Sequence, residues 1–234
     1  MDIQFITTPH GNREGMSFDA GDIDLIDFNG FTPLIHASIE ENNDLVEYLL
    51  NRGADINVES LDEQATALAF ACHCGNFSIV KILLDHGAAI DTFDVEGLTP
   101  LHRACFLGYP AITKLLLDRG ATIVNHPLSP LHLACKNGSI KCAIELLNRG
   151  MDVDLQDFRG DTPIDLAIRF GHQSIVNVLL NHRISKLCFK VKAAEGEELD
   201  RFKTEQVEKR LCFGIFLIYI LFRILYISSS CTIE

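Results

Sequence analysis

Residues 97–104 read Gly97-Leu98-Thr99-Pro100-Leu101-His102-Arg103-Ala104, and this stretch decides the fold. A glycine suits a tight turn, and proline suits the first turn of a helix because the amide hydrogen that it lacks would have no partner there. A short apolar helix follows, then a break at Gly108 and a second helix that ends at Gly120. The stretch therefore predicts a turn followed by a helical hairpin.

The same pattern occurs four more times along the chain. Aligned on the Thr or Ser before the first helix, the five copies are separated by 34, 33, 30 and 33 residues. These anchors are Thr32, Thr66, Thr99, Ser129 and Thr162. Each copy is followed by a helix with paired leucines, which are Leu49-Leu50, Leu83-Leu84, Leu116-Leu117, Leu146-Leu147 and Leu179-Leu180. Five units in a fixed order indicate a repeat protein.

A period near 33 residues around a Thr-Pro-Leu-His-x-Ala core resembles the ankyrin repeat, a β-turn followed by two antiparallel helices. The resemblance covers about residues 20–183, with repeats that start near residues 27, 61, 94, 125 and 157. It implies an all-α, right-handed solenoid of helix-turn-helix units with short β-turn fingers. Because one unit cannot bury its own apolar side, we expect stacking between units to supply the stability.

Three repeats depart from this pattern. In repeat two, Gln64 replaces the turn glycine, Ala67 the proline and Ala69 the histidine, and the finger is one residue longer. Repeat four is three residues short at residues 125–127, so we expect a clipped finger. In repeat five, Arg183-Ile184 replaces Gly-Ala, and without a glycine to stop it the last helix is expected to run on.

The segments outside the repeats lack the repeat period. Residues 1–19 are read as a flexible lead-in, and the chain then enters midway through a unit, without the capping helices that a solenoid end needs. Residues 184–210 are rich in Glu and Lys and are read as a charged helical spacer. Residues 228–234 form a short polar end.

Residues 211–227 are apolar except for Arg223. As a helix, this segment spans roughly 26 Å, just short of the hydrocarbon core of a bilayer. Arg223 lies near its end, where its side chain can reach the headgroups, and Lys209-Arg210 would keep the repeats on the cytosolic side. A C-terminal membrane anchor is one reading. Translated non-coding sequence and a helix folded onto the open end of the solenoid are the others.

The charge limits the classes of partner. The chain has a net charge of −12, and residues 1–183 hold 12 Lys and Arg against 25 Asp and Glu, a net −13. An acidic body argues against binding of nucleic acid, which needs a basic face, and favours a protein with a basic and apolar surface. Eight cysteines without an N-terminal apolar signal segment indicate free thiols and a cytoplasmic location.

Metal binding and catalysis are both disfavoured. Cys72-His73-Cys74 and the histidines His102 and His132 suggest zinc, but equivalent residues lie roughly 10 Å apart in a helical stack, too far to share one ion. We read His102 and His132 as structural residues that bond to the adjoining turn. The sequence contains no nucleophile elbow, P-loop, zinc-protease or kinase motif. We therefore expect no cofactor, no metal and no enzyme activity.

Recognition of another protein remains, and the resemblance places it on the fingers and the exposed positions of the first helices. Apolar residues and a rim of carboxylates in such positions resemble the anatomy of a binding hot spot. The apolar candidates are Phe31, Leu98, Phe106, Leu107, Leu128 and Phe170. The acidic candidates are Asp62, Glu63, Glu96 and Asp161. Alternatively, neighbouring fingers cover these apolar side chains and make them part of the core.

The function predicted from sequence is therefore a non-enzymatic adaptor, scaffold or regulatory subunit, with a possible tether at its C-terminus. A second reading is the N-terminal part of an ankyrin-repeat membrane protein of the channel or palmitoyltransferase type, although the chain has no Asp-His-His-Cys motif. A third is a ubiquitin-ligase adaptor with a SOCS box, for which Leu187-Cys188 is the only matching fragment.

Overall fold

The computed structural model describes residues 23–123 and 128–198, with side chains up to residue 188. The chain divides into two compact units, Met1–Arg183 and Ile184–Glu234. The predicted lead-in, the centre of finger four, the end of the charged spacer and the apolar segment 211–227 lie outside the described residues. Among the residues that are described, no helix is both long and apolar enough to cross a membrane.

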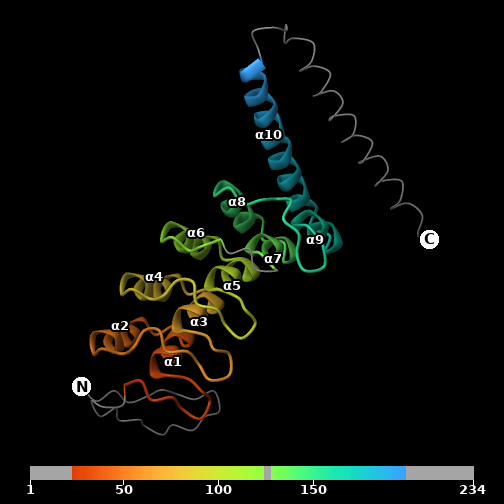
Figure 1. Cartoon of the computed structure of the whole chain (residues 1–234). Helices are drawn as coiled ribbons and strands as arrows, with labels where there is room; N and C mark the ends of the chain where they lie inside the picture. The colour runs from red at the N-terminus through yellow and green to blue at the C-terminus, as the bar shows by residue number, and fades with distance from the viewer. Residues whose placement is uncertain (1–22, 124–127, 199–234) are drawn as a thin grey trace, which may run out of the picture. The chain divides into compact units, whose positions relative to one another are not determined.

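Ten helices occupy the described part of the chain, in two layers (Figure 1). The first helices of the repeats are α1 (Pro33–Ile39), α3 (Ala67–Cys74), α5 (Pro100–Leu107), α7 (Pro130–Lys136) and α9 (Pro163–Arg169). The second helices are α2 (Asn43–Asn51), α4 (Phe77–Asp85), α6 (Pro110–Asp118), α8 (Ile140–Asn148) and α10 (Gln173–Glu198). Successive first helices contact one another, as do α2, α4, α6 and α8. The predicted all-α repeat solenoid is confirmed.

The regular spacing of Thr and Ser between repeats has a local cause, because each of these residues caps a first helix. Its hydroxyl accepts a hydrogen bond from the backbone N–H three residues later, which satisfies one amide that has no partner inside the helix. Proline follows the cap in all first helices except α3. Repeat two still forms α3, so the cap and the packing suffice without the proline.

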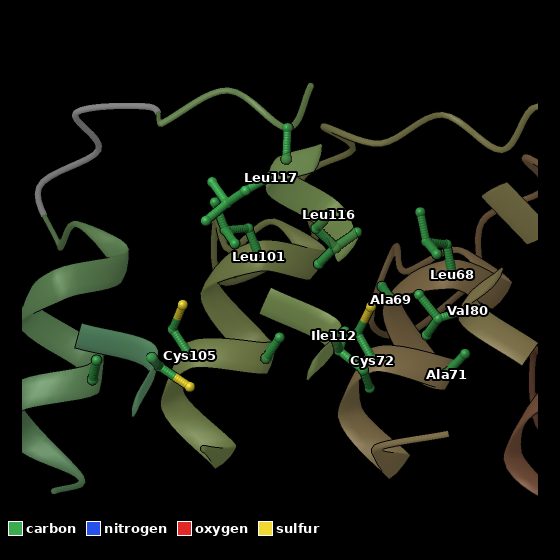
Figure 2. Packing of buried hydrophobic residues seen from close by; sticks show 14 of the residues in the cluster. Leu68, Ala69, Ala71, Cys72, Val80, Leu101, Cys105, Ile112, Leu116 and Leu117 are labelled. Carbon is green, nitrogen blue, oxygen red and sulfur yellow. The ribbon is translucent and has the colours of Figure 1, made fainter. Parts of the chain in front are cut away.

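The core runs between the two layers of helices (Figure 2). In repeat three, Leu101 from α5 and Ile112 and Leu116 from α6 are almost fully buried. The corresponding residues of repeat two, which are Leu68, Ile79 and Leu83, are buried as well. Burying one such side chain stabilises the fold by about 1.5–3 kcal/mol relative to leaving it exposed. Each hairpin shares this core with its neighbours, as stacking predicts.

Polar side chains in the segments before the fingers, and at the ends of the second helices, also join neighbouring repeats. The side chains of Asp24, Asn57 and Asp91 each accept a hydrogen bond from a backbone amide in the next repeat, at 3.0, 2.8 and 3.0 Å. Arg119 Nη2 lies 2.6 Å from Asp85 Oδ1 one repeat earlier, and Arg149 pairs in the same way with Asp118. These bonds fix the step from one repeat to the next.

Repeat five ends differently from the others. Its second helix buries Ile175, Val176 and Leu179 and then, as the missing glycine predicts, continues without a stop to Glu198. Arg183 pairs with Asp154 at 3.2 Å.

Candidate functional site

Three of the fingers are closed by the carboxylate of their first residue. In finger one, residues 27–31, Asp27 Oδ1 accepts hydrogen bonds from the amides of Asn29 and Phe31, both at 2.9 Å. Asp94 does the same in finger three (residues 94–98), and Asp157 in finger five (residues 157–161). Our sequence reading missed these aspartates, although each precedes its Thr cap by five residues.

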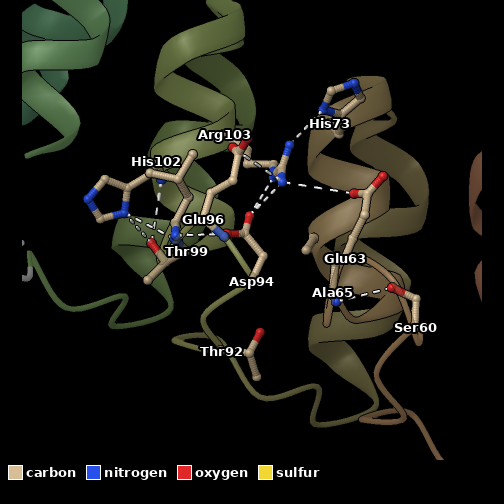
Figure 3. A network of polar contacts seen from close by, with 12 residues as sticks. Ser60, Glu63, Ala65, His73, Thr92, Asp94, Glu96, Thr99, His102 and Arg103 are labelled. Atoms are coloured by element: carbon tan, nitrogen blue, oxygen red, sulfur yellow. Dashed lines mark hydrogen bonds and ion pairs between the residues drawn. The ribbon is translucent and has the colours of Figure 1, made fainter. Parts of the chain in front are cut away.

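In repeat three the other carboxylate oxygen of this aspartate holds Arg103, which lies on α5 (Figure 3). Asp94 Oδ2 lies 2.8 Å from Arg103 Nε and 2.6 Å from Nη2, and the Asp94 side chain is only 1% exposed. The carboxylates of Glu63 and Glu96 each lie 3.9 Å from the same guanidinium, and His73 Nδ1 lies 3.4 Å from Arg103 Nη1. Three carboxylates around one guanidinium leave this part of the surface negative.

Repeat one uses the same arrangement with a weaker base. His36 occupies the position of Arg103 in the repeat, and its Nε2 lies 2.9 Å from Asp27 Oδ2. Burial by itself would raise the pKa of Asp27, but the amide of Phe31 and the His36 ring outweigh burial and lower the pKa from its usual 3.8. The finger is therefore tied to its own first helix in repeats one and three.

The four predicted acidic residues do not share one environment. Asp62, Glu63 and Glu96 are exposed, as a polar rim requires. Asp161 is half-buried and pairs with Arg169 at 2.7 Å. Its backbone oxygen also accepts a hydrogen bond from His132 Nε2 at 3.1 Å. Asp161 therefore already has partners within its own repeat and the one before it.

The predicted apolar residues are divided between surface and interior. Phe106 and Phe170 are 38% and 46% exposed. Leu98, Leu107 and Leu128 are partly buried, and so is Phe31, whose ring packs edge-on against His36 and Phe70 with centroids 5.4 and 5.3 Å apart. Phe31 thus joins repeat one to repeat two. Phe106 and Phe170 are the residues of this set that remain available.

The exposed pair flanks a lysine. Phe106 is near the end of α5, Lys136 ends α7 and Phe170 follows α9, so the three residues come from consecutive repeats. Lys136 Nζ lies 5.9 Å from the centroid of the Phe106 ring and 6.0 Å from that of Phe170. Both distances are at the limit of a cation–π contact. We call these three residues the Phe–Lys–Phe cluster.

The fingertips carry exposed apolar side chains that are not among the predicted binding residues. The residue after the first position of each described finger is apolar and exposed, and these residues are Phe28 (85%), Leu61 (65%), Val95 (60%) and Phe158 (67%). Fingers one to three are also joined, because the amides of Leu61 and Val95 donate to the carbonyls of Gly30 and Glu63 at 3.1 and 2.8 Å. The sequence signal for three of these residues is their position directly after a finger aspartate, whereas Leu61 follows Ser60.

The histidines of the repeat core are structural, as predicted. His102 Nδ1 lies 2.7 Å from the Thr99 hydroxyl and accepts from the Thr99 amide at 3.2 Å. His132 Nδ1 lies 2.7 Å from the Ser129 hydroxyl, and burial lowers the pKa of His132. Both rings therefore help to close the turn before their helix.

The cysteines in the first helices belong to the core. Cys72, Cys105 and Cys135 are fully buried, and burial raises the pKa of each thiol. A buried protonated thiol is a poor nucleophile and a poor metal ligand. In residues 23–123 and 128–198, no three His, Cys, Asp or Glu side chains are grouped as a metal site would require.

Comparison with known families finds the repeats directly. A model described as ankyrin repeats in three copies matches residues 59–127 and 123–189, and a single ankyrin repeat model matches residues 29–61. Together these matches follow the repeats from the first finger into α10.

Similar proteins carry further segments. The chain is 35% identical over 162 residues to Ankyrin repeat protein nuc-2 of Neurospora crassa, a match that covers 67% of this chain and 15% of that protein. It is 32% identical over 160 residues to Putative ankyrin repeat protein FPV031 of fowlpox virus, covering 67% and 38%. It is 26% identical over 185 residues to human Palmitoyltransferase ZDHHC13, covering 62% and 30%. The chain thus spans less than two fifths of each relative.

Proposed function

The chain belongs to the ankyrin-repeat family, and we propose that it is a non-enzymatic adaptor or scaffold that binds another protein on its fingers and first helices. Ankyrin repeats generally serve as interaction modules. The observation that carries the proposal is a contrast between two sets of side chains. One set is occupied by contacts within the repeats, and the other stays exposed at the surface. The caps, the core histidines and the finger aspartates are all occupied by contacts within the repeats, whereas Glu63, Glu96, Phe106 and Phe170 remain at the surface.

The partner that fits best is basic and apolar. Glu63 and Glu96 face a guanidinium that Asp94 already neutralises, so their own charges are available to a cation from outside. Fingertip side chains beside them provide apolar area, and aromatic or aliphatic anchors within a polar rim are typical of binding hot spots.

Charge reversal on the recognition surface tests this proposal. Proteins captured on the full chain should bind E96K at least several-fold more weakly, whereas E47K, which reverses an exposed carboxylate on α2, should bind like the wild type. The comparison uses the same captured protein against all three chains by titration calorimetry. Equal loss in E96K and E47K would indicate a general effect of net charge and would contradict the proposed surface.

We also propose that the chain works in the cytoplasm and is tethered to a membrane by residues 211–227. The apolar composition of this segment and the basic residues before it support the tether. A fluorescent fusion of the full chain should localise to membranes, and removal of residues 211–234 should release it. Diffuse signal from both fusions would eliminate the tether.

A second candidate function is that of the recognition segment of a palmitoyltransferase-type membrane protein. The match to human Palmitoyltransferase ZDHHC13 favours it. Sequencing of transcripts tests this candidate, because it requires further apolar spans and an Asp-His-His-Cys motif encoded beyond Glu234. A transcript that stops after Glu234 would remove it.

A further inference from the structure

The basic residues on the first helices of the described repeats differ in their partners. Arg103 on α5 is bound by Asp94, and Arg169 at the end of α9 is bound by Asp161. No ion pair within 4.0 Å joins Lys136, on α7, to a carboxylate of the residues that the structure describes. Its ammonium group lies over the rings of Phe106 and Phe170, while its backbone oxygen bonds to His172 Nε2. Its positive charge is therefore uncompensated locally.

The two rings leave the ammonium group able to bind an anion. A lysine ammonium has three N–H donors, and contact with a ring face satisfies none of them as a hydrogen bond to oxygen does. Lys136 is exposed, so a group from outside can approach it. The charges of more distant carboxylates are screened within about 8 Å at physiological ionic strength, and the acidic body as a whole does not cancel this site.

The chemistry of the cluster selects the group that fits. One ammonium balances one negative charge, while the neighbouring Arg169 is already paired with Asp161 and supplies no second cation. A single carboxylate therefore fits better than a doubly charged phosphate. The exposed rings on either side of Lys136 favour an apolar side chain next to that carboxylate.

The acidic surface of repeats two and three lies close to this cluster. Arg103 and Phe106 are three residues apart on α5 and so lie on the same side of the helix. Glu63 and Glu96 surround Arg103, whereas Lys136 lies against Phe106 from the next repeat. The surface therefore changes sign across Phe106, from negative on the side of Arg103 to positive on the side of Lys136.

We propose that the Phe–Lys–Phe cluster is a subsite for an Asp or Glu side chain of the partner, next to an apolar residue that lies against Phe106 or Phe170. This inference rests on the proposed function, and it adds an acidic side chain to the basic and apolar surface expected of the partner. The bound segment carries a basic residue for Glu63 and Glu96, then an apolar residue, then an acidic residue. Its charge order fixes the direction in which it lies along the repeats.

A peptide selection tests the subsite without a known partner. A phage library of random twelve-residue peptides is panned on the full wild-type chain, on K136E, on K136M and on the control K141E. Lys141 is an exposed lysine on α8, so K141E changes the net charge equally but in the other layer of helices. Thermal melting of the four chains checks that the fold is retained, as expected for exposed positions.

The expected result is a selective change in the enriched peptides. Wild type and K141E enrich peptides in which an acidic residue lies beside an apolar one, K136M loses the acidic preference by at least about threefold, and K136E replaces it with a basic preference. Enrichment with the same acidic frequency on all four chains, or an equal change in K141E, overturns the subsite and leaves the proposed function standing. A wild-type chain that enriches no peptide overturns both.

Discussion

Repeat three closes its finger with the buried Asp94 and turns at Gly97, whereas repeat two closes a longer finger with Ser60 and turns at Gln64. The first helices that follow are nevertheless of equal length, eight residues each, and both begin after a Thr cap. The cap and the shared core are therefore enough to form the hairpin. The finger aspartate has a further effect. In repeat three, Asp94 holds Arg103 beside Glu63 and Glu96, and this part of the surface is negative.

The largest expected effect comes from removing Asp94, the finger residue that repeat two replaces with Ser60. Asp94→Ala should lower the free energy of unfolding by about 2–4 kcal/mol, because it leaves a largely buried guanidinium without its main partner and opens finger three. Ser60→Ala in repeat two should cost only about 1 kcal/mol, since no charge is left unpaired. Urea denaturation of the full chain measures both. Equal losses would mean that Arg103 does not depend on Asp94.

The next effect concerns binding rather than stability. Phe106→Ala should weaken binding of a captured partner by ~1–3 kcal/mol with little loss of melting temperature, because the ring lies at the surface of repeat three. Ile144→Ala is the matched control, since Ile144 is 39% exposed against 38% for Phe106 but lies on α8. Titration calorimetry and thermal melting separate the two effects. A large melting loss with unchanged binding would make Phe106 a core residue.

A glycine in the turn of repeat two should stabilise the fold. Gln64 has φ of 50°, a left-handed conformation that glycine takes in finger three, where Gly97 has φ of 74°. Gln64→Gly should therefore raise the free energy of unfolding by about 0.5–1 kcal/mol, after the entropy cost of glycine is subtracted. Gly97→Ala should lower it by about 1 kcal/mol. Denaturation midpoints that move in the opposite directions would show that the finger two turn is not strained.

The smallest effect is a dependence on pH through finger one. The pKa of Asp27 is lowered from 3.8 in the folded chain, so its stabilising contribution is fully present above about pH 4 and is lost as the pH falls through the folded value. As the pH falls below about 4, D27N should lose less of its unfolding free energy than the wild type in urea denaturation, because the variant has no carboxylate to protonate at this position. Identical losses in the two chains would contradict the lowered pKa.

The fold was predictable because its signals are local and repeated. The Thr and Ser anchors are helix caps, the first leucine of each pair is buried in the core, and Arg183 in place of a glycine lets the last helix continue. Each of these roles depends on a residue and its near neighbours in the sequence, so the spacing alone revealed them.

The candidate surface was less predictable because exposure depends on contacts between repeats. Phe31, on a finger, and Phe106, on a first helix, are both predicted to be exposed, but Phe31 packs on Phe70 of the next repeat while Phe106 lies against Lys136 at the surface. Arg103 occupies the variable position before the core alanine, and its role appears only when Glu63 from the preceding finger is placed beside it. Contacts of this kind cannot be read from one repeat at a time.

Hydrogen exchange of the full chain, with and without a captured partner, shows whether the partner covers the fingers and first helices or the second helices. Binding should slow exchange in the fingers and at the ends of α5, α7 and α9, while α4, α6 and α8 should exchange as in the free chain. Protection confined to α4, α6 and α8 would place the partner on the opposite layer and would contradict binding by the fingers and first helices.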